Sequence, residues 1–169
     1  MLGRLPEGPV YWHLTTYPTR AAADTAKGPN GTVVESYGKV WLFTIAEADW
    51  RAPGGEYVTA IGPLPVGTAE KFSIVYMEAT FMPGMQSIVH RHPGPEAWYV
   101  LAGEQCLETP EGRMVVRAGE SGIVPGGPAM RLTGTGTVQR RSLVLILHDS
   151  SQRWASPAQD WTPKGLCNN

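Results

Sequence analysis

Short runs in which apolar and polar residues alternate fill most of this chain, a pattern typical of β-strands whose two faces have different surroundings. In the run 72–81, every second residue from Val75 to Phe81 is apolar, so we expect this face to point toward the interior. The run 142–148 is apolar throughout, which is typical of a strand buried on both faces. The same reasoning predicts further strands at 8–18, 32–36, 39–46, 57–61, 97–102, 114–117 and 119–125.

One stretch, residues 19–27, favours a helix. Thr19 can cap its first turn, alanines follow, and Gly28 with Pro29 ends it. The 20 glycines and 15 prolines are spread along the chain, which suits many short strands joined by tight turns. We therefore predict an all-β fold with one short helix near the N-terminus.

The length of 169 residues suits one domain, so we expect a single domain over 1–169. Within it we expect N-terminal strands at 8–65, a core barrel at about 70–150, and a C-terminal tail at 149–169 that wraps over the barrel. The net charge is −1 and 17% of the residues are charged. A basic surface for nucleic acid is therefore not expected.

Two observations bear on the location of the protein. No run of about 18 apolar residues occurs, so we expect no membrane span. The first ten residues lack the charged-then-apolar pattern of a signal peptide. We expect a cytoplasmic protein, although a chain that begins after a removed signal peptide would look the same.

The chain has two cysteines, Cys106 and Cys167, which is too few for a disulfide framework. They could form one disulfide. The simpler interpretation is two separate thiols, with Cys106 buried in a strand and Cys167 in a loose C-terminal segment.

The residues that could bind a metal come after the predicted strand at 72–81. His90 and His92 are separated by one residue, so on a strand their side chains point the same way. Pro93, Gly94 and Pro95 give a turn signal that can bring Glu96 on the next strand back beside both imidazoles. Two imidazole nitrogens and one carboxylate oxygen on a common face are the ligand set of a divalent metal site with open positions.

This stretch resembles the first motif of the cupin superfamily, G-x5-H-x-H-x3or4-E-x6-G. Gly84, His90, His92, Glu96 and Gly103 fill every position of that motif. The second cupin motif, G-x5-P-x-G-x2-H-x3-N, is matched in part.

Gly119, Pro125 and Gly127 fit the second motif, but Met130 stands where the family usually has its last metal-binding histidine, and Gly134 stands at the terminal Asn. The resemblance covers roughly residues 77–148. It implies a small RmlC-like jelly-roll β-barrel with any metal held inside. It also implies a homodimer, because small cupin-like chains often use N-terminal strands to extend the sheet of a neighbour.

Four further residues are candidates for the pocket. Gln86 is an even number of residues from the two histidines, so on a strand its side chain points to the same face as theirs. Trp98 shares a face with Glu96 for the same reason. Met130 could offer a thioether, which would favour copper, although a methionine on an apolar strand face more often only packs. His148 could supply a third imidazole if the last strand turns it inward.

Two classes of function fit these residues. The first is a metal-dependent enzyme, such as a dioxygenase of the non-haem iron type, an isomerase or a lyase, that acts on a small organic molecule with Fe, Mn, Ni, Cu or Zn. The second is a non-catalytic module that binds a small molecule, or a degenerate cupin without metal. No catalytic triad, phosphate-binding glycine loop or dinucleotide fingerprint supports another class.

Overall fold

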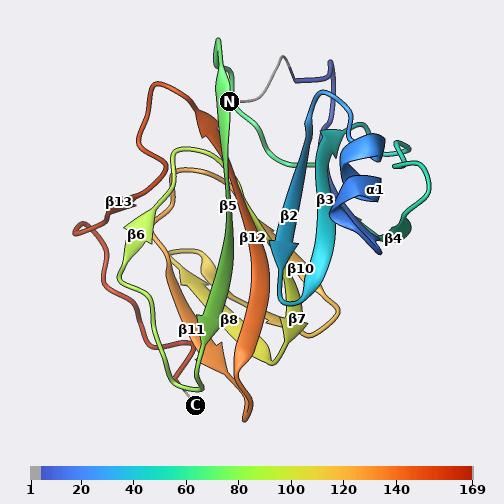
Figure 1. Cartoon of the computed structure of the whole chain (residues 1–169). Helices are drawn as coiled ribbons and strands as arrows, with labels where there is room; N and C mark the ends of the chain where they lie inside the picture. Colours follow the sequence, from blue (N-terminus) through green and yellow to red (C-terminus); the bar gives the residue numbers. More distant parts are fainter. Residues whose placement is uncertain (1–4, 169) are drawn as a thin grey trace. The chain divides into compact units, whose positions relative to one another are not determined.

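Strands with one short helix make up the computed structural model, which describes residues 5–168 (Figure 1). The expected all-β fold with a short helix near the N-terminus is therefore confirmed. The chain divides into two units, Met1–Leu64 and Pro65–Asn169. The expectation of a single domain stays a prediction.

The first unit is an antiparallel sheet with the strand order β2-β3-β1-β4 and one helix. Its helix α1 begins after Thr19, whose side chain accepts a hydrogen bond of 3.2 Å from the backbone N of Ala22, as the sequence predicts for an N-cap. The elements are β1 (Tyr11–Tyr17), α1 (Arg20–Ala26), β2 (Gly31–Ser36), β3 (Lys39–Ala46) and β4 (Glu56–Ile61).

The second unit contains three antiparallel sheets, with the strand orders β10-β7-β12-β5, β11-β8-β9 and β13-β6. The longest pairing joins β12 to β5 over ten residues of each strand. The strands are β5 (Phe72–Phe81), β6 (His90–Arg91), β7 (Glu96–Ala102), β8 (Glu104–Thr109), β9 (Gly112–Arg117), β10 (Ser121–Val124), β11 (Arg131–Thr135), β12 (Arg140–Asp149) and β13 (Ser156–Pro157).

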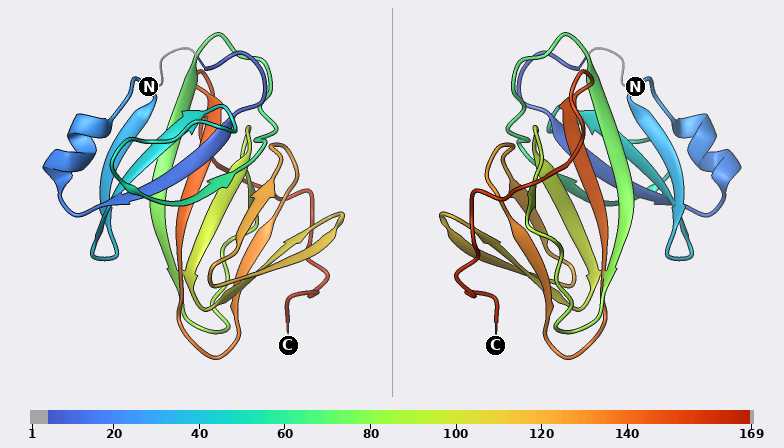
Figure 2. Two further views of the ribbon diagram at one scale, coloured as in Figure 1. Left: turned by 90° about the vertical axis from the view of Figure 1, so that its right-hand side faces the viewer. Right: turned by 90° about the vertical axis from the view of Figure 1, so that its left-hand side faces the viewer.

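Backbone hydrogen bonds connect β6 and the residues before it to the edge of the β11-β8-β9 sheet. Ser87 N donates to Leu132 O at 2.9 Å, and His90 exchanges two bonds with Met130, at 3.1 and 2.8 Å. The β11-β8-β9 sheet with β6 therefore lies opposite the β10-β7-β12-β5 sheet, as Figure 2 shows. Two opposed antiparallel sheets are the architecture of a jelly roll, as predicted.

The core of the second unit lies between these two sheets. The β10-β7-β12-β5 sheet contributes Trp98, Val144 and Ile146, and the facing sheet contributes Leu107 and Val116. Met77 and Ala79 of β5 pack against the same cluster. The alternation in residues 72–81 therefore predicted the interior face of β5 correctly.

The C-terminal segment, residues 150–168, runs along the second unit past β6 (Figure 1). Its strand β13 pairs with β6, and Arg91 forms an ion pair with Asp160 at 2.6 Å. Farther along, the buried carboxylate of Glu108 accepts hydrogen bonds from the backbone N of Lys164 and of Leu166. The described part of the tail therefore packs on the second unit.

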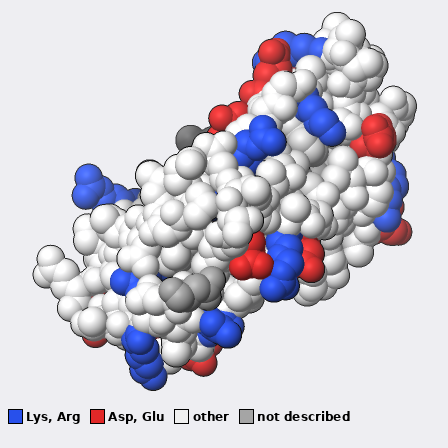
Figure 3. Space-filling model, turned by 90° about the horizontal axis from the view of Figure 1, so that it is seen from below, with Lys and Arg blue, Asp and Glu red and all other residues white. Residues whose placement is uncertain are grey.

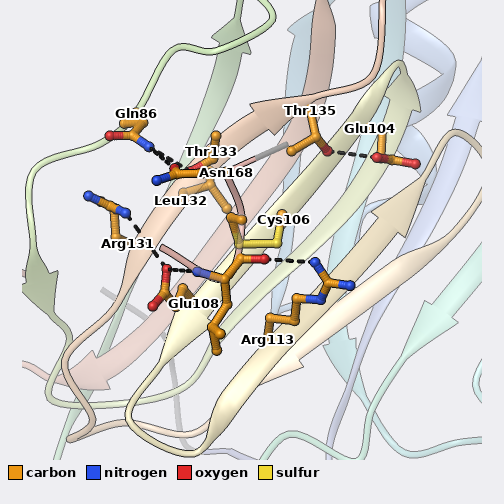
Figure 4. Close-up of a disulfide and its surroundings, with 12 residues drawn as sticks. Gln86, Glu104, Cys106, Glu108, Arg113, Arg131, Leu132, Thr133, Thr135 and Asn168 are labelled. Atoms are coloured by element: carbon orange, nitrogen blue, oxygen red, sulfur yellow. Dashed lines mark hydrogen bonds and ion pairs between the residues drawn. A yellow bond between two sulfur atoms is a disulfide. The ribbon is translucent and has the colours of Figure 1, made fainter. Parts of the chain in front are cut away.

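A disulfide between Cys106 and Cys167 fixes the end of this segment to β8 (Figure 4). The interpretation of the cysteines as two separate thiols is wrong. Glu108, two residues after Cys106, holds the backbone just before Cys167, and Arg113 donates to Leu166 O at 2.7 Å. These contacts bring the two sulfur atoms together, which explains the pairing of residues that are 61 positions apart.

Charges of both signs are mixed on the face seen in Figure 3, and neither sign gathers into a large patch. This agrees with the small net charge of the sequence. Across residues 5–168, no helix has the length and apolar character needed to cross a bilayer.

We expect the Cys106→Ser, Cys167→Ser double variant to be less stable than the wild type. In the chain-entropy description, a disulfide stabilises the fold by restricting the unfolded chain, and loss of a native disulfide typically lowers the free energy of unfolding by about 2–5 kcal/mol. Urea denaturation of both proteins measures the difference. Wild type treated with a reductant should match the double variant, and an unchanged unfolding midpoint in both would contradict the prediction.

Candidate metal centre

His90, His92 and Glu96 lie together at one end of the second unit. One possible ligand atom from each side chain lies within 4.8 Å of the others. The imidazole centroids are 4.9 Å apart with the rings at 82°, and His92 Nε2 lies 3.4 Å from Glu96 Oε2. The three residues that the sequence predicts as metal ligands are therefore close enough to serve one ion.

The turn between β6 and β7 produces this arrangement. A Cβ atom added to Gly94 would lie 2.0 Å from the carbonyl oxygen of Leu147 and 3.1 Å from the Cα of His148, so only glycine fits there. This close approach holds the turn against β12, and Leu147 N donates to Pro95 O at 3.1 Å. Glu96 then begins β7 opposite Ile146, on the side of the sheet that faces the histidines.

Both imidazoles are held through Nδ1 by backbone carbonyl groups. His90 Nδ1 lies 2.8 Å from Ile88 O, and His92 Nδ1 lies 2.7 Å from Trp154 O. Because a carbonyl oxygen only accepts hydrogen bonds, Nδ1 carries the proton in the neutral form of each ring, which leaves the lone pair on Nε2. Metal-binding histidines commonly donate their second nitrogen to a backbone carbonyl in this way.

The Nε2 atom of His92 is buried, and among the described residues it makes no hydrogen bond of good geometry, since Glu96 Oε2 lies 3.4 Å away. Burial lowers the pKa of His92, but Glu96 and the Trp154 carbonyl outweigh that effect and raise the pKa above its usual value. The ring of Trp154 also stacks on His92, with centroids 5.9 Å apart. The site thus holds a buried imidazole nitrogen 3.4 Å from a carboxylate, an arrangement that favours a shared cation, whether a proton or a metal ion.

The three residues line a cavity of about 380 Å³ inside the jelly roll. Most of its wall is apolar, and residues 154–157 of the C-terminal segment form part of it. A volume near the lower end of the range of ligand pockets suits a small organic molecule. Apolar wall residues from both sheets include Met77, Phe81, Leu107, Leu132 and Val144.

The structure separates the four further pocket candidates into two groups. Trp98 and Met130 line this cavity, and each is 1% exposed. Gln86 instead lines a second hollow, where it donates to Asn168 Oδ1 at 3.2 Å (Figure 4). His148 is likewise absent from the described lining of the first cavity. It lies two residues beyond Ile146 on β12, and its Nδ1 contacts the Asp149 carbonyl at 2.8 Å.

Several contributors to the cavity were not identified from the sequence, and three of them bear on its chemistry. Arg140 and Gln105 line it from β12 and β8, and Trp154 covers His92. Strand parity could have indicated Arg140, which shares a face with Val144 and Ile146. A backbone carbonyl such as that of Trp154 leaves no signal in the sequence, because every residue has one.

The comparisons with known proteins agree with the fold. Residues 77–145 match the family described as "Cupin domain", and this stretch contains His90, His92 and Glu96. A comparison with curated proteins found no match.

Solved structures similar to this chain include an oxalate oxidase, with 22% identity over 46% of each chain and a TM-score of 0.39. A Cupin 2 conserved barrel domain protein from Salinispora arenicola CNS-205 has 20% identity over 46% of this chain and 65% of its own, with a TM-score of 0.41. The DMSP lyase DddQ from Ruegeria pomeroyi DSS-3 has 21% identity over 51% of this chain and 43% of its own, with a TM-score of 0.43. In each case the chain spans less than two-thirds of the length of the solved structure.

Proposed function

Residues 77–145 form a cupin domain, and from this premise we propose that His90, His92 and Glu96 bind one divalent metal ion and that the chain acts there on a small organic molecule. The metal would be Fe, Mn, Ni, Cu or Zn, since all five accept imidazole ligands.

The observation that carries this proposal is the buried Nε2 of His92. Its nearest polar partner is Glu96 Oε2 at 3.4 Å, which is too long for a good hydrogen bond, and a buried polar atom without a good hydrogen bond is unfavourable by about 1–3 kcal/mol. Glu96 and His90 lie beside it with both imidazole Nδ1 atoms engaged elsewhere. A cation shared by the three residues would satisfy the lone pair and balance the carboxylate.

Three protein ligands leave coordination positions open. A metal with open positions can act as a Lewis acid or support reactions of dioxygen. The apolar wall would hold the organic part of the substrate, and Trp154 with its neighbours would limit the access of water from the side of the C-terminal segment. We therefore favour an enzyme of the dioxygenase, isomerase or lyase type.

A module that binds a small molecule without turning it over is the second candidate. The mostly apolar cavity favours it, because Glu96 is the one carboxylate among the described residues that line the cavity, and it would be occupied as a ligand. Product formation by the metal-loaded protein separates the enzyme from the binding module.

The homodimer expected from the resemblance is also a proposal. In the described part of the first unit, β2 and β4 are the outer strands of the sheet. An outer strand can pair with a strand of a second copy, which supports dimerisation through this sheet. Sedimentation velocity would measure the oligomeric state.

The location of the protein follows from a separate argument. Disulfides persist in oxidising compartments and are rare in the cytosol. The Cys106–Cys167 disulfide therefore supports an oxidising compartment over the cytoplasm expected from the sequence.

The double variant His90→Ala, His92→Ala should lose stoichiometric metal binding, because only one of the three proposed ligands remains. Isothermal titration of metal-free protein with Fe(II), Mn(II), Ni(II) and Zn(II) measures this loss. The matched control is His148→Ala, which removes a buried histidine of the same unit from outside the cluster. Equal metal binding by the double variant and the wild type would rule out the site.

Met130→His should tighten metal binding by adding a fourth protein ligand, since affinity rises with the number of ligands. Met130 lines the cavity, and its backbone pairs with that of His90, so the new imidazole would lie near the cluster. The same variant should slow any metal-dependent turnover, because it fills an open position. If titration shows metal binding in the variant and none in the wild type, the chain is a degenerate cupin instead.

A further inference from the structure

The strand register shows how far the cavity wall extends from the metal cluster. Glu96 pairs with Ile146 of β12, at the level of the cluster. Four residues earlier on the same face of β12, Ser142 pairs with Ala79 of β5. At about 3.3 Å per residue, these two levels are roughly 13 Å apart along the strand. The wall between them is lined by Met77, Trp98 and Val144, which pair with one another across the sheet.

The polar side chains at the far end of the cavity are bonded to one another. Arg140 Nη1 donates to Gln105 Oε1 at 2.5 Å and to Ser142 Oγ at 2.7 Å, and Gln105 belongs to the opposite sheet. Arg140 and Gln105 are each 1% exposed, and Ser142 is fully buried. These hydrogen bonds therefore join the two sheets, and the groups that make them offer almost no surface to a ligand.

Two further polar side chains in the lining are also engaged or buried. Ser87 Oγ donates to Ile88 O at 2.9 Å and accepts from Leu132 N at 3.0 Å. Nε1 of Trp98 is buried against Gly122 of β10, where an added Cβ atom would lie 3.0 Å from it.

The polar side chains of the described lining that keep exposed surface lie at the cluster end. His90 and Glu96 are partly exposed there, and Ser156 lies on β13, which pairs with β6. A ligand therefore meets polar partners at one end of the cavity and hydrocarbon along the rest. A second polar group at its far end would be buried without a partner, which is unfavourable.

Ala79 has the smallest side chain on the part of β5 that lines the cavity. It lies between Met77 and Phe81 on the same face, and all three are only partly buried. Its methyl group leaves space that a longer side chain at this position would fill. The length of the hydrocarbon that fits beside β5 thus depends on this residue.

We propose that the substrate is a small molecule with one oxygen-bearing headgroup and a hydrocarbon body, and that Ala79 is a specificity-determining residue that limits the length of this body. The inference rests on the proposed function for the headgroup, which the metal binds. The apolar part of the site needs only the cavity.

The first test titrates Zn(II)-loaded protein with straight-chain alkyl hydroxamic acids from propanohydroxamic to decanohydroxamic acid. A hydroxamate binds metal through two oxygens, so it stands in for the headgroup. Affinity should rise about fourfold with each CH₂ group until the chain reaches the end of the cavity, because each one leaves water for an apolar wall. A hydroxyl group on the last carbon should weaken binding about tenfold, because it would lack a partner.

Ala79→Leu should end the rise in affinity about three carbons earlier, because the larger side chain occupies the same space as the chain. The matched control is Ala118→Leu, the same change at an exposed position outside the cavity lining. Thermal unfolding shows whether each variant is folded, and the smaller change Ala79→Val takes the place of Ala79→Leu if the latter is not.

The second test uses metal-free protein and straight-chain alkanols from butanol to octanol, followed by NMR titration. The same rise with chain length, shortened by Ala79→Leu, is expected without metal. The apolar site therefore stands even if titration shows no metal binding, so the two proposals fail separately. Affinity that does not depend on chain length, equal binding of the hydroxylated and plain chains, or a wild-type profile in folded Ala79→Leu overturns the proposal.

Discussion

The desolvation of the His92 imidazole, beside the partly buried His90 and Glu96, is the constraint on which the account of this site depends. His92 is 2% exposed, and most of the wall around it is hydrocarbon. Backbone carbonyl groups satisfy Nδ1 of both histidines, whereas Nε2 of His92 has only Glu96 Oε2, 3.4 Å away, as a polar neighbour among the described residues. An apolar barrel keeps such groups at a free-energy cost unless a cation or a ligand compensates. A shared metal ion is the simplest compensation.

Segments far apart in the sequence cooperate to hold this cluster. The turn at Gly94 packs on the backbone of β12, which sets Glu96 beside the histidines. The C-terminal segment then covers the cluster, and its Trp154 both accepts from His92 and stacks on it. The Cys106–Cys167 disulfide anchors the end of the same segment on β8. The orientation of a proposed metal ligand is thereby linked to a covalent bond in another part of the barrel.

The sequence predicts what local patterns determine. Alternation predicted the inner face of β5, the Thr19 cap predicted the start of α1, and the spacing of His90, His92 and Glu96 predicted a cluster that a single turn can close. The disulfide depends on the path of 61 intervening residues, so the sequence left it open. Arg140 was missed for another reason: two adjacent arginines precede the apolar run at 142–148, and the hydrogen bonds of Arg140 to Gln105 and Ser142 on the inner face depend on packing that the sequence does not show.

The most direct test of the central claim is a crystal structure of protein purified without chelator, with anomalous scattering measured at the Fe, Mn, Ni, Cu and Zn edges. The account predicts one anomalous peak per chain, within bonding distance of Nε2 of His90, Nε2 of His92 and a carboxylate oxygen of Glu96. A site that stays free of any anomalous scatterer after soaking with these metals, with Glu96 hydrogen-bonded directly to His92, would contradict it.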